Sequence, residues 1–465
     1  MSDDSTPAPP PLADPSWAGH IQATLRLGLP LIAAQLGQQA ITVTDTIMLG
    51  WLGAAELAAG VLATSLFFVA FIACSGFAHA VMPLAAAAEG RGDPRGVRRS
   101  VRMGLWLVTA VVTLLMPVLW YTEVLLLAAA QDPKLASFAQ EYMRIAQWAL
   151  YPAVWLVVLR SYFSALERAG IVMWAMFGGV LLNAVLDWMF IFGNWGAPAM
   201  GIEGAAIATL GTAIITCVPL VVAAFWMEIS RKYEIFVRFW RPDWAAIAEL
   251  LRLGAPISGT LLAEVGLFVM ASMMLGWLGT IALAAHGIAL QVTSVVFMIP
   301  LGLSAAATAR VGRAVGRRDR LGLNRAAVTV MTMAVGFAAA AAVVLWVVPE
   351  PLIELFLDDE EPAALQILAT GAGLLAVAAV FQLVDALQVV SVALLRGLKD
   401  TKWPMLIAIA SYWGLGVPSA YFLGFVMEFG GQGVWAGLAI GLTAAAVLLT
   451  WRFMRRDALG LVVPA

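Results

Sequence analysis

Four acidic residues fall inside long apolar stretches of the sequence: Asp45, Asp187, Glu264 and Asp385. A charge at the depth of a lipid bilayer is costly, so such a residue persists only where it has partners or a task. We expect no Lys or Arg residue at matching depth to neutralise these acids. A buried carboxylate without a cationic partner takes up and releases protons near neutral pH, or binds a hard cation such as Na⁺ through its oxygens. The four acids therefore predict coupling to H⁺, to Na⁺ or to both.

In the N-terminal half, the spacing of the acids places them beside other polar residues. One face of the first predicted helix carries polar residues at steps of three and four, namely Gln35, Gln38, Thr42 and Asp45. Asn183 and Asp187 are four residues apart and share a face of a later helix. We expect these two faces to form one carboxylate cluster, joined by amide and hydroxyl groups.

The C-terminal half carries its acids at different positions. Thr260 precedes Glu264 by about one helical turn, and Gln382 precedes Asp385 in the same way. We expect a second polar site here, formed by Glu264 and Asp385. The two halves therefore contain similar chemistry that is arranged asymmetrically.

Composition indicates which elements must position these residues. Apolar residues make up 62% of the chain and charged residues 12%, whereas soluble domains are nearer half apolar and a quarter charged. The apolar runs are about 20 residues long or longer, as membrane-crossing helices require, and they lack the short alternation of a barrel. The sequence therefore predicts an all-α integral membrane protein with twelve transmembrane helices. The predicted spans are 29–50, 57–88, 101–128, 138–165, 171–193, 202–227, 253–278, 283–313, 325–348, 365–395, 403–425 and 433–453.

The basic residues predict the orientation in the membrane, because Lys and Arg are concentrated in loops that stay in the cytoplasm. With the N-terminus inside, all of the 27 Lys and Arg residues except Lys134 and Arg144 lie on or near the cytoplasmic side. We interpret their clusters as topology signals and not as nucleic-acid patches, so no nucleic-acid partner is expected. The prediction is a multi-pass protein of the plasma (inner) membrane with both termini in the cytoplasm.

An internal repeat divides the chain into halves. The residues MLGWLG occur at Met48 to Gly53 and again at Met274 to Gly279, 226 positions later. Each half holds six predicted helices, so both begin on the same side of the membrane, and a pseudo-twofold axis along the membrane normal should relate the two bundles. Rocking of the bundles would open the cleft between them to alternate sides, as in a transporter. The expected organisation is a disordered cytoplasmic tail (1–22), an N-lobe (23–228), a cytoplasmic linker (229–250), a C-lobe (251–456) and a cytoplasmic tail (457–465).

After the N-terminal tail, the whole sequence resembles the multidrug and toxic compound extrusion (MATE) family. The resemblance rests on LGLPLIAAQLGQQAITVTDTIMLGWLG, IPLGLSAAATARVGRAVGRRD and VDALQVVSVALLRGLKDT, in the first, eighth and tenth predicted helices. It implies that Asp45 is the first-helix acid used for proton or sodium coupling. It also implies that Glu264 and Asp385 match the pair that binds a cation, such as Na⁺, in the NorM-like branch.

Other residues resemble the DinF-like branch of the same family. Asn183 and Asp187 match the N-lobe partners of the first-helix acid in that branch, and Tyr142 and Thr209 are further matches. The chain thus carries both sets of residues. The resemblance leaves open which lobe carries coupling, and whether H⁺, Na⁺ or both drive transport.

The expected function is cation-coupled antiport that exports amphipathic organic cations, such as drugs or toxins, by alternating access. Carboxylates beside Phe268, Met270, Met273 and Phe381 would suit bulky cations with apolar faces, because Met adapts its shape and aromatic rings offer cation-π contacts. We expect a monomer surrounded by membrane lipid, with no cofactor other than the coupling ion.

Two other classes of protein are alternatives. A lipid-linked oligosaccharide flippase of a related superfamily would share the two-bundle architecture, but it needs Arg or Lys in the cleft to bind an anionic pyrophosphate. A membrane-embedded enzyme is not expected, because the sequence contains no His-Glu-x-x-His, Gly-x-Ser-x-Gly or P-loop motif.

Overall fold

The structure is a computed structural model that describes residues 16–357 and 363–462, and its regular elements there are all helical. The N-terminal half contains α1 (Trp17–Gly50), α2 (Ala54–His79), α3 (Val81–Gly90), α4 (Pro94–Trp120), α5 (Thr122–Ala128), α6 (Pro133–Ala146), η1 (Gln147–Ala149), α7 (Leu150–Ala165), α8 (Ala169–Phe192), η2 (Asn194–Gly196) and α9 (Gly201–Trp226). The short helix α10 (Glu228–Arg231) follows. The C-terminal half contains α11 (Trp244–Leu278), α12 (Thr280–Arg317), α13 (Arg320–Val347), α14 (Pro349–Glu354), α15 (Ala364–Gly397), α16 (Lys402–Ile409), η3 (Ala410–Gly416), α17 (Val417–Tyr421), η4 (Phe422–Val426) and α18 (Gly430–Met454).

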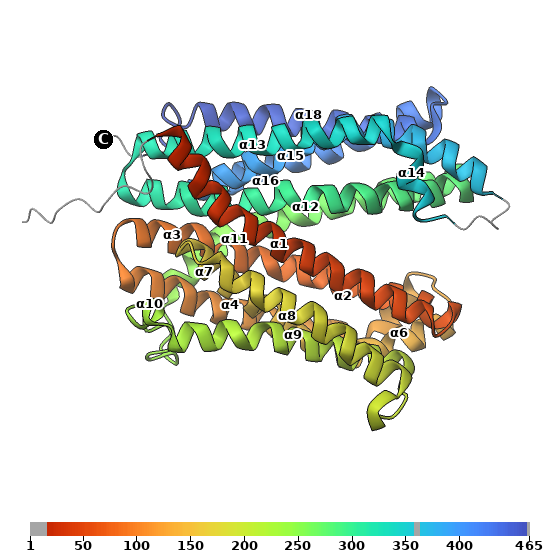
Figure 1. The fold of residues 1–465 in the computed structure, drawn as a ribbon, viewed down its shortest axis with the longest axis horizontal. Coiled ribbons are helices and arrows are strands. Elements are labelled where there is room, and N and C mark those ends of the chain that lie inside the picture. The colour runs from red at the N-terminus through yellow and green to blue at the C-terminus, as the bar shows by residue number, and fades with distance from the viewer. Residues whose placement is uncertain (1–15, 358–362, 463–465) are drawn as a thin grey trace, which may run out of the picture.

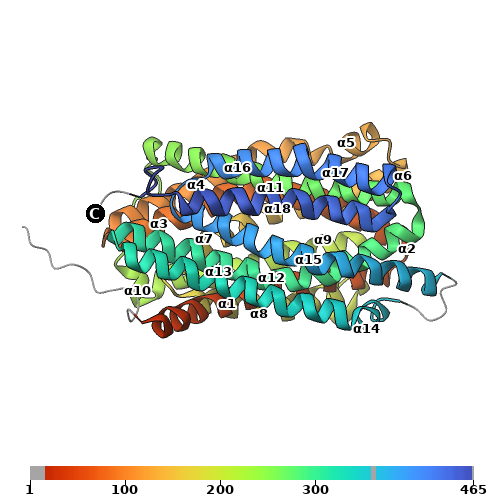
Figure 2. The ribbon, with the colours of Figure 1, turned by 90° about the horizontal axis from the view of Figure 1, so that it is seen from above.

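The predicted set of twelve transmembrane helices is confirmed. Eleven helical segments of the described chain are long and apolar enough to cross a membrane. The twelfth is α1, a 34-residue helix that carries the polar positions around Asp45. Three of the eleven are assembled from shorter elements: α2 with α3, α6 with η1 and α7, and α16 with η3, α17 and η4. Long helices run along the long axis of the molecule (Figures 1 and 2).

Three predicted boundaries need correction. Residues 17–22, predicted as part of a disordered tail, form the start of α1, because Ser16 caps the helix by accepting a hydrogen bond from the Gly19 amide; residues 1–15 lie outside the described chain. The predicted linker 229–250 contains the first turns of α11, which begins at Trp244. The predicted helix 101–128 is interrupted at Tyr121, where α4 ends and α5 follows.

Aspartate caps fix the starts of helices in both halves. The side chain of Asp93 accepts a hydrogen bond from the Gly96 amide at the start of α4, and Asp319 accepts one from Gly322 at the start of α13. Such a bond satisfies one of the free amides of a first helical turn. Asp93 and Asp319 are 226 positions apart, so the offset of the sequence repeat is also the offset of the structural repeat.

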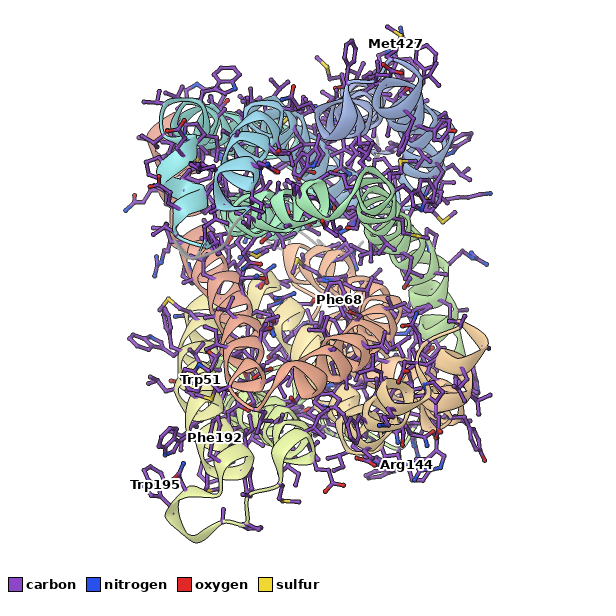
Figure 3. All side chains as sticks on the ribbon, turned by 90° about the vertical axis from the view of Figure 1, so that its right-hand side faces the viewer. Trp51, Phe68, Arg144, Phe192, Trp195 and Met427 are labelled. Atoms are coloured by element: carbon purple, nitrogen blue, oxygen red, sulfur yellow. The ribbon has the colours of Figure 1, made fainter. Side chains whose placement is uncertain are left out.

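The helices form two bundles, α1–α9 and α11–α18, each with its own apolar core. Figure 1 shows the N-terminal bundle below the C-terminal bundle, with the C-terminus and the start of α1 at the same end of the molecule. Viewed from the opposite end, Trp51, Phe192, Trp195 and Met427 lie toward the outside of the molecule (Figure 3). All of these except Phe192 are largely exposed, as expected of residues in an interfacial belt.

Close contacts between the bundles come in twofold-related pairs. A β-carbon on Gly302 would lie 2.7 Å from the Cα of Ile32, and one on Gly76 would lie 2.6 Å from the Cα of Ser258. Gly76 and Gly302 are equivalent at the offset of 226, and so are Ile32 and Ser258. The same contact is therefore made twice, as the predicted pseudo-twofold relation requires.

The first helix of each half crosses from one bundle to the other. In α1, Leu27 and Leu31 pack with Ala306 of α12, whereas Ile41 belongs to the N-terminal core. In α11, Leu250 belongs to the N-terminal core and Leu267 to the C-terminal core. These crossings join the bundles at the end that carries the described chain ends (Figure 1).

Candidate functional site

The structure brings Asp45, Asn183 and Asp187 together in the N-terminal bundle, where α1 packs along α8. The Asn183 side-chain amide donates a 2.7 Å hydrogen bond to Asp45 Oδ1. Asn183 and Asp187 are fully buried, and the carboxyl groups of Asp45 and Asp187 interact electrostatically. The helical spacing of these residues thus yields the cluster that the sequence predicts.

This N-terminal cluster is rich in unsatisfied acceptors. Both carboxyl oxygens of Asp187 and the amide oxygen of Asn183 are buried. Asp187 lies within hydrogen-bonding range of Asp45 and Asn183, but two ionised carboxylates have no proton to share in such a bond. A buried polar atom without a partner costs free energy. Bound protons or a hard cation would remove that cost, so the arrangement is suited to hold either.

Tyr142 and Thr209 border the same cluster. The Tyr142 hydroxyl lies 3.1 Å from Thr209 Oγ1, and it interacts electrostatically with Asp45 and Asp187. Tyr142 comes from α6 and Thr209 from α9, so four helices of one bundle meet at this site. The two residues therefore lie close enough to the acids to influence ion binding.

Gln38 and Thr42 are not joined to the acid cluster. Both are exposed, and the Thr42 hydroxyl makes a 3.4 Å hydrogen bond to the Gln38 carbonyl of its own helix. Another α1 amide, Gln35, accepts a 2.5 Å hydrogen bond from Arg160 of α7. The polar residues of α1 therefore do not form one site: Gln35 bonds to Arg160 of α7, whereas Asp45 bonds to Asn183 of α8.

A second cluster lies in the C-terminal bundle around Glu264 of α11 and Asp385 of α15. The two carboxyl groups interact electrostatically, and both interact with the Tyr412 hydroxyl group of η3. Tyr412 accepts a 2.6 Å hydrogen bond from the side-chain amide of Gln388. Asp385 is 4% exposed, and its Oδ1 has no hydrogen-bond partner in the described structure.

The side chains of α15 supply further oxygens near this position. Gln382 donates a 2.8 Å hydrogen bond from its amide nitrogen to the Thr293 carbonyl. The amide oxygens of Gln382 and Gln388 are buried without partners among the described residues. Such oxygens, together with Asp385, are chemically suited to Na⁺, because hard cations bind oxygen ligands. The predicted use of Glu264 and Asp385 as metal ligands remains a prediction.

One basic residue lies nearer to the C-terminal acids than the sequence suggests, although no ion pair among the described residues involves Glu264 or Asp385. Arg396 of α15 interacts electrostatically with Glu264. Arg396 lies just beyond the predicted span 365–395, but it is eleven residues after Asp385, which is about three helical turns. This spacing places Arg396 on the same face of α15 as Asp385, but about 16 Å farther along the helix, so the sequence alone does not make it a neighbour of the acids.

Several other candidates fill packing roles. The Thr260 hydroxyl bonds to the Pro256 carbonyl of its own helix. Phe381 is buried and forms edge contacts with the rings of Phe268 and Trp435. Among the predicted substrate contacts, Met273 is 51% exposed and remains accessible.

Comparisons with known proteins agree with this architecture. Residues 30–189 and 256–422 match the model of the MatE family. The chain is 49% identical to the "Probable multidrug resistance protein NorM" of Rhizobium meliloti (strain 1021), over 95% of each chain. It is 40% identical to the protein of the same name from Pseudomonas aeruginosa (strain PAO1), over 93% of this chain and 89% of that protein.

A solved structure shares the fold. The crystal structure of the eukaryotic MATE transporter AtDTX14 superposes with a TM-score of 0.86 at 20% sequence identity, over 96% of this chain and 99% of that one. The family model matches more than half of the chain, and the relatives align over nearly all of it. The chain is therefore a multi-pass membrane protein that belongs to the MatE family.

Proposed function

We propose that the protein exports amphipathic organic cations, such as drugs or toxins, in exchange for H⁺, Na⁺ or both. The observation that carries this proposal is a pair of carboxyl clusters, one in each bundle, in which a buried acid, Asp187 or Asp385, interacts with a half-buried one, Asp45 or Glu264. The names of the relatives support a role in multidrug resistance. The coupling residues proposed are these four acids together with Asn183.

The chemistry of coupling follows from repulsion between neighbouring carboxylates. Two ionised carboxyl groups at close range destabilise each other, and a proton or a metal cation removes the repulsion. A cationic substrate in the same electrostatic field is favoured when these ions have left. Binding of ion and substrate is then mutually unfavourable, and by linkage each lowers the affinity of the other by the same factor. This reciprocity produces antiport.

The N-terminal cluster is proposed as the obligatory coupling site. Asn183 donates a hydrogen bond to Asp45. None of the described arginines is among the groups that interact electrostatically with Asp45 or Asp187. In the C-terminal cluster, Arg396 already provides positive charge near Glu264. This difference is our reason for proposing that the N-terminal cluster, which has no basic neighbour of this kind among the described residues, depends more on an entering proton or Na⁺ for charge compensation than the C-terminal cluster does.

The close contacts between the bundles support alternating access. Gly302 meets Ile32 and Gly76 meets Ser258 near the middle of the long helices, and Gly90 meets Gly316 where α3 and α12 end, on the side of the described chain ends. With both termini in the cytoplasm, we infer that this conformation is closed toward the cytoplasm and opens outward. The bundles must separate at these glycines to admit substrate from inside the cell.

The energy for export would come from the membrane. A potential of 100 mV supplies about 2.3 kcal/mol for each charge moved, so a cycle with net charge movement needs no ATP. The alternative of an oligosaccharide flippase is less well supported, although Arg160 and Arg396 lie inside the bundles. Arg160 is bonded to Gln35 and Arg396 lies near Glu264, so neither is a free site for pyrophosphate.

Reconstituted vesicles test the proposed function. The purified protein is placed in liposomes with a cationic dye, and either a pure proton gradient or a pure sodium gradient is imposed. Antiport predicts that one or both gradients drive the dye against its own gradient. Dye movement that depends on neither gradient would contradict the proposal, and movement of a lipid-linked pyrophosphate instead would favour the flippase.

A further inference from the structure

An arginine pocket lies outside the proposed transport sites, where the start of α4 meets the linker before α11. Its cavity has a volume of about 270 Å³ and is lined by Arg95, Arg98, Arg99, Arg102, Arg238, Arg241 and Asp243. The first four arginines belong to α4, and the last two belong to the linker. The fold therefore gathers six guanidinium groups from two distant segments around one opening.

Only part of this positive charge is balanced by the protein. Arg98 forms a 2.6 Å ion pair with Glu234, and Arg99 binds both oxygens of Asp243, at 2.5 and 2.8 Å. The hydrogen bond from Arg99 lowers the pKa of the Asp243 carboxyl, so Asp243 stays ionised at neutral pH.

The other arginines of the pocket lack such compensation. Arg102 donates to the backbone carbonyls of Val237 and Arg238. Within the described chain, none of the side chains of Arg95, Arg238 and Arg241 forms an ion pair. The pocket therefore has an excess of positive charge that the described residues do not neutralise.

The placement of the arginines on α4 is unfavourable for an isolated helix. Arg95, Arg98, Arg99 and Arg102 follow one another at helical spacing, so like charges face each other along one side. They also lie in the first turns of α4, which begins at Pro94, where the helix dipole disfavours cations. An anion bound between them would relieve both effects.

The C-terminal half shows that a helix at this place in the fold does not need four arginines in its first turns. Its equivalent helix, α13, begins with the same aspartate cap, 226 positions later. The positions equivalent to the four α4 arginines are Leu321, Asn324, Arg325 and Val328. A helix at this place in the fold therefore forms with one arginine, and the stripe of four is specific to the N-terminal half.

The surroundings of the pocket place it at the depth of lipid headgroups. Trp226, Trp240 and Trp244 are each more than 70% exposed, and they lie on the segments that enter and leave the linker. Trp106 of α4 donates its indole N–H to the Phe239 carbonyl. Exposed tryptophans beside transmembrane helices are typical of the membrane interface.

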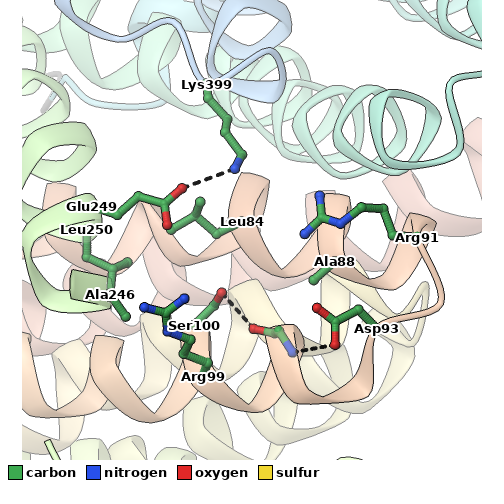
Figure 4. Close-up of a pocket in the computed structure, with 11 residues that line it drawn as sticks. Leu84, Ala88, Arg91, Asp93, Arg99, Ser100, Ala246, Glu249, Leu250 and Lys399 are labelled. Carbon is green, nitrogen blue, oxygen red and sulfur yellow. Dashed lines mark hydrogen bonds and ion pairs between the residues drawn. The ribbon is translucent and has the colours of Figure 1, made fainter. Parts of the chain in front are cut away.

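A neighbouring pocket differs in its charge balance. It has a volume of about 130 Å³ and shares Arg99 with the arginine pocket, but its lining also includes Asp93 and Glu249. Figure 4 shows Lys399 paired with Glu249 and the Asp93 carboxylate bonded to the Gly96 amide. The lining of this neighbouring pocket therefore carries less excess positive charge than the lining of the arginine pocket.

We propose that the arginine pocket binds the phosphate of an anionic phospholipid from the adjoining leaflet. Guanidinium groups bind phosphate oxygens through paired hydrogen bonds, and basic pockets between transmembrane helices are suited to anionic headgroups. The bound lipid would join α4 to the linker that connects the two bundles. This site is separate from the carboxyl clusters and does not depend on which ion or substrate is transported.

Lipid binding can be measured on the full-length protein in a neutral detergent. Phosphatidylglycerol, phosphatidylcholine and inorganic phosphate are titrated separately, and bound lipid is counted by native mass spectrometry. The test variant combines R95Q, R238Q and R241Q. The control combines R318Q, R325Q and R455Q, which removes the same charge from the C-terminal bundle near the same end of the molecule.

We expect the wild-type protein and the control to bind one phosphatidylglycerol more tightly than phosphatidylcholine. The test variant should lose affinity on the order of 100-fold, since each arginine near a membrane surface contributes about a factor of five. The single variant R241Q should lose about fivefold, which keeps the test decisive if the triple variant does not fold. Unchanged binding in the folded variants would overturn the proposal. Saturation by inorganic phosphate with no preference for the lipid would overturn the assignment of a lipid.

Discussion

Gly90 and Gly316 face each other across the two bundles: a β-carbon on either residue would lie 3.0 Å from the Cα of the other. They are equivalent positions, 226 residues apart, so each meets its own counterpart and the contact lies on the pseudo-twofold axis. One turn earlier, Ala86 and Gly312 form another pair of this kind, since a β-carbon on Gly312 would lie 2.9 Å from that of Ala86. The bundles are therefore in close contact along this axis, at the end that the proposed alternating access would open.

Substitution of Gly316 by alanine should weaken this closed contact. The added methyl group would overlap the Ala87 carbonyl oxygen and lie 3.0 Å from Gly90, so the bundles must separate to accommodate it. A cysteine introduced at Ser258, in a protein with Cys74 and Cys217 replaced by alanine, should then react severalfold faster with a maleimide. The matched control is G336A, because a β-carbon there meets no atom within 4 Å. Equal labelling rates in G316A and G336A would show that this contact does not hold the bundles together.

Replacement of Arg310 should destabilise the start of α1. This residue of α12 is 1% exposed; it donates to the Thr24 hydroxyl, to the His20 carbonyl at 3.0 Å and to His20 Nδ1 at 2.9 Å. Removing this donor leaves buried acceptors unsatisfied, which costs about 1–3 kcal/mol. R310M should therefore lower the thermal unfolding temperature and accelerate proteolysis at the start of α1.

The control for this experiment is R325M. Arg325 stacks its guanidinium on the exposed ring of Trp17, 5.7 Å from the ring centre. Loss of an exposed cation-π contact costs about 0.5–1 kcal/mol. If R310M and R325M are equally stable, the buried bonds of Arg310 do not secure α1.

The N-terminal cluster should no longer couple transport when Asp45 cannot bind and release a proton or a cation. D45N resembles the protonated acid in volume and can still pair with Asn183, so folding should be retained. Gradient-driven efflux of a cationic dye from reconstituted vesicles should be abolished. Normal efflux by D45N would show that the N-terminal cluster does not carry coupling.

The C-terminal acids, Glu264 and Asp385, should determine how strongly drug release depends on Na⁺. E264Q and D385N each remove an anionic oxygen donor from the cluster that contains Gln388 and Tyr412. Na⁺-dependent drug release should weaken or disappear in each variant, while release driven by H⁺ persists through Asp45 and Asp187. Full sodium stimulation in both variants would assign these acids a structural role.

The parts of the structure that depend on spacing along one helix were accessible from the sequence. Asn183 and Asp187 share a face because they are four residues apart, and both meet Asp45 as expected. The repeat offset gave the pseudo-twofold relation because equivalent positions, such as Gly76 and Gly302, have the same residue type.

Features that depend on packing between distant segments were not accessible in this way. Helical periodicity gives the faces of α1 but not the bundle that each face contacts, so the docking of His20 and Thr24 on Arg310 was not predicted. Likewise, Arg238 and Arg241 join the arginines of α4 only because the linker folds back onto that helix. Thr42 is exposed and bonds to the Gln38 carbonyl of its own helix, whereas Asn183 and Asp187 are buried.

Displacement of ions by substrate tests the central proposal most directly. The cationic dye is titrated into detergent-solubilised protein in weakly buffered solution, while proton release and Na⁺ release are recorded. Competition for shared carboxylates predicts that wild-type protein releases H⁺ or Na⁺ as the dye binds, and that dye affinity falls as pH is lowered. Because D45N cannot release a proton at that position, its release should be reduced. Tight dye binding by the wild type without release of either ion, at an affinity independent of pH and sodium, would contradict the account.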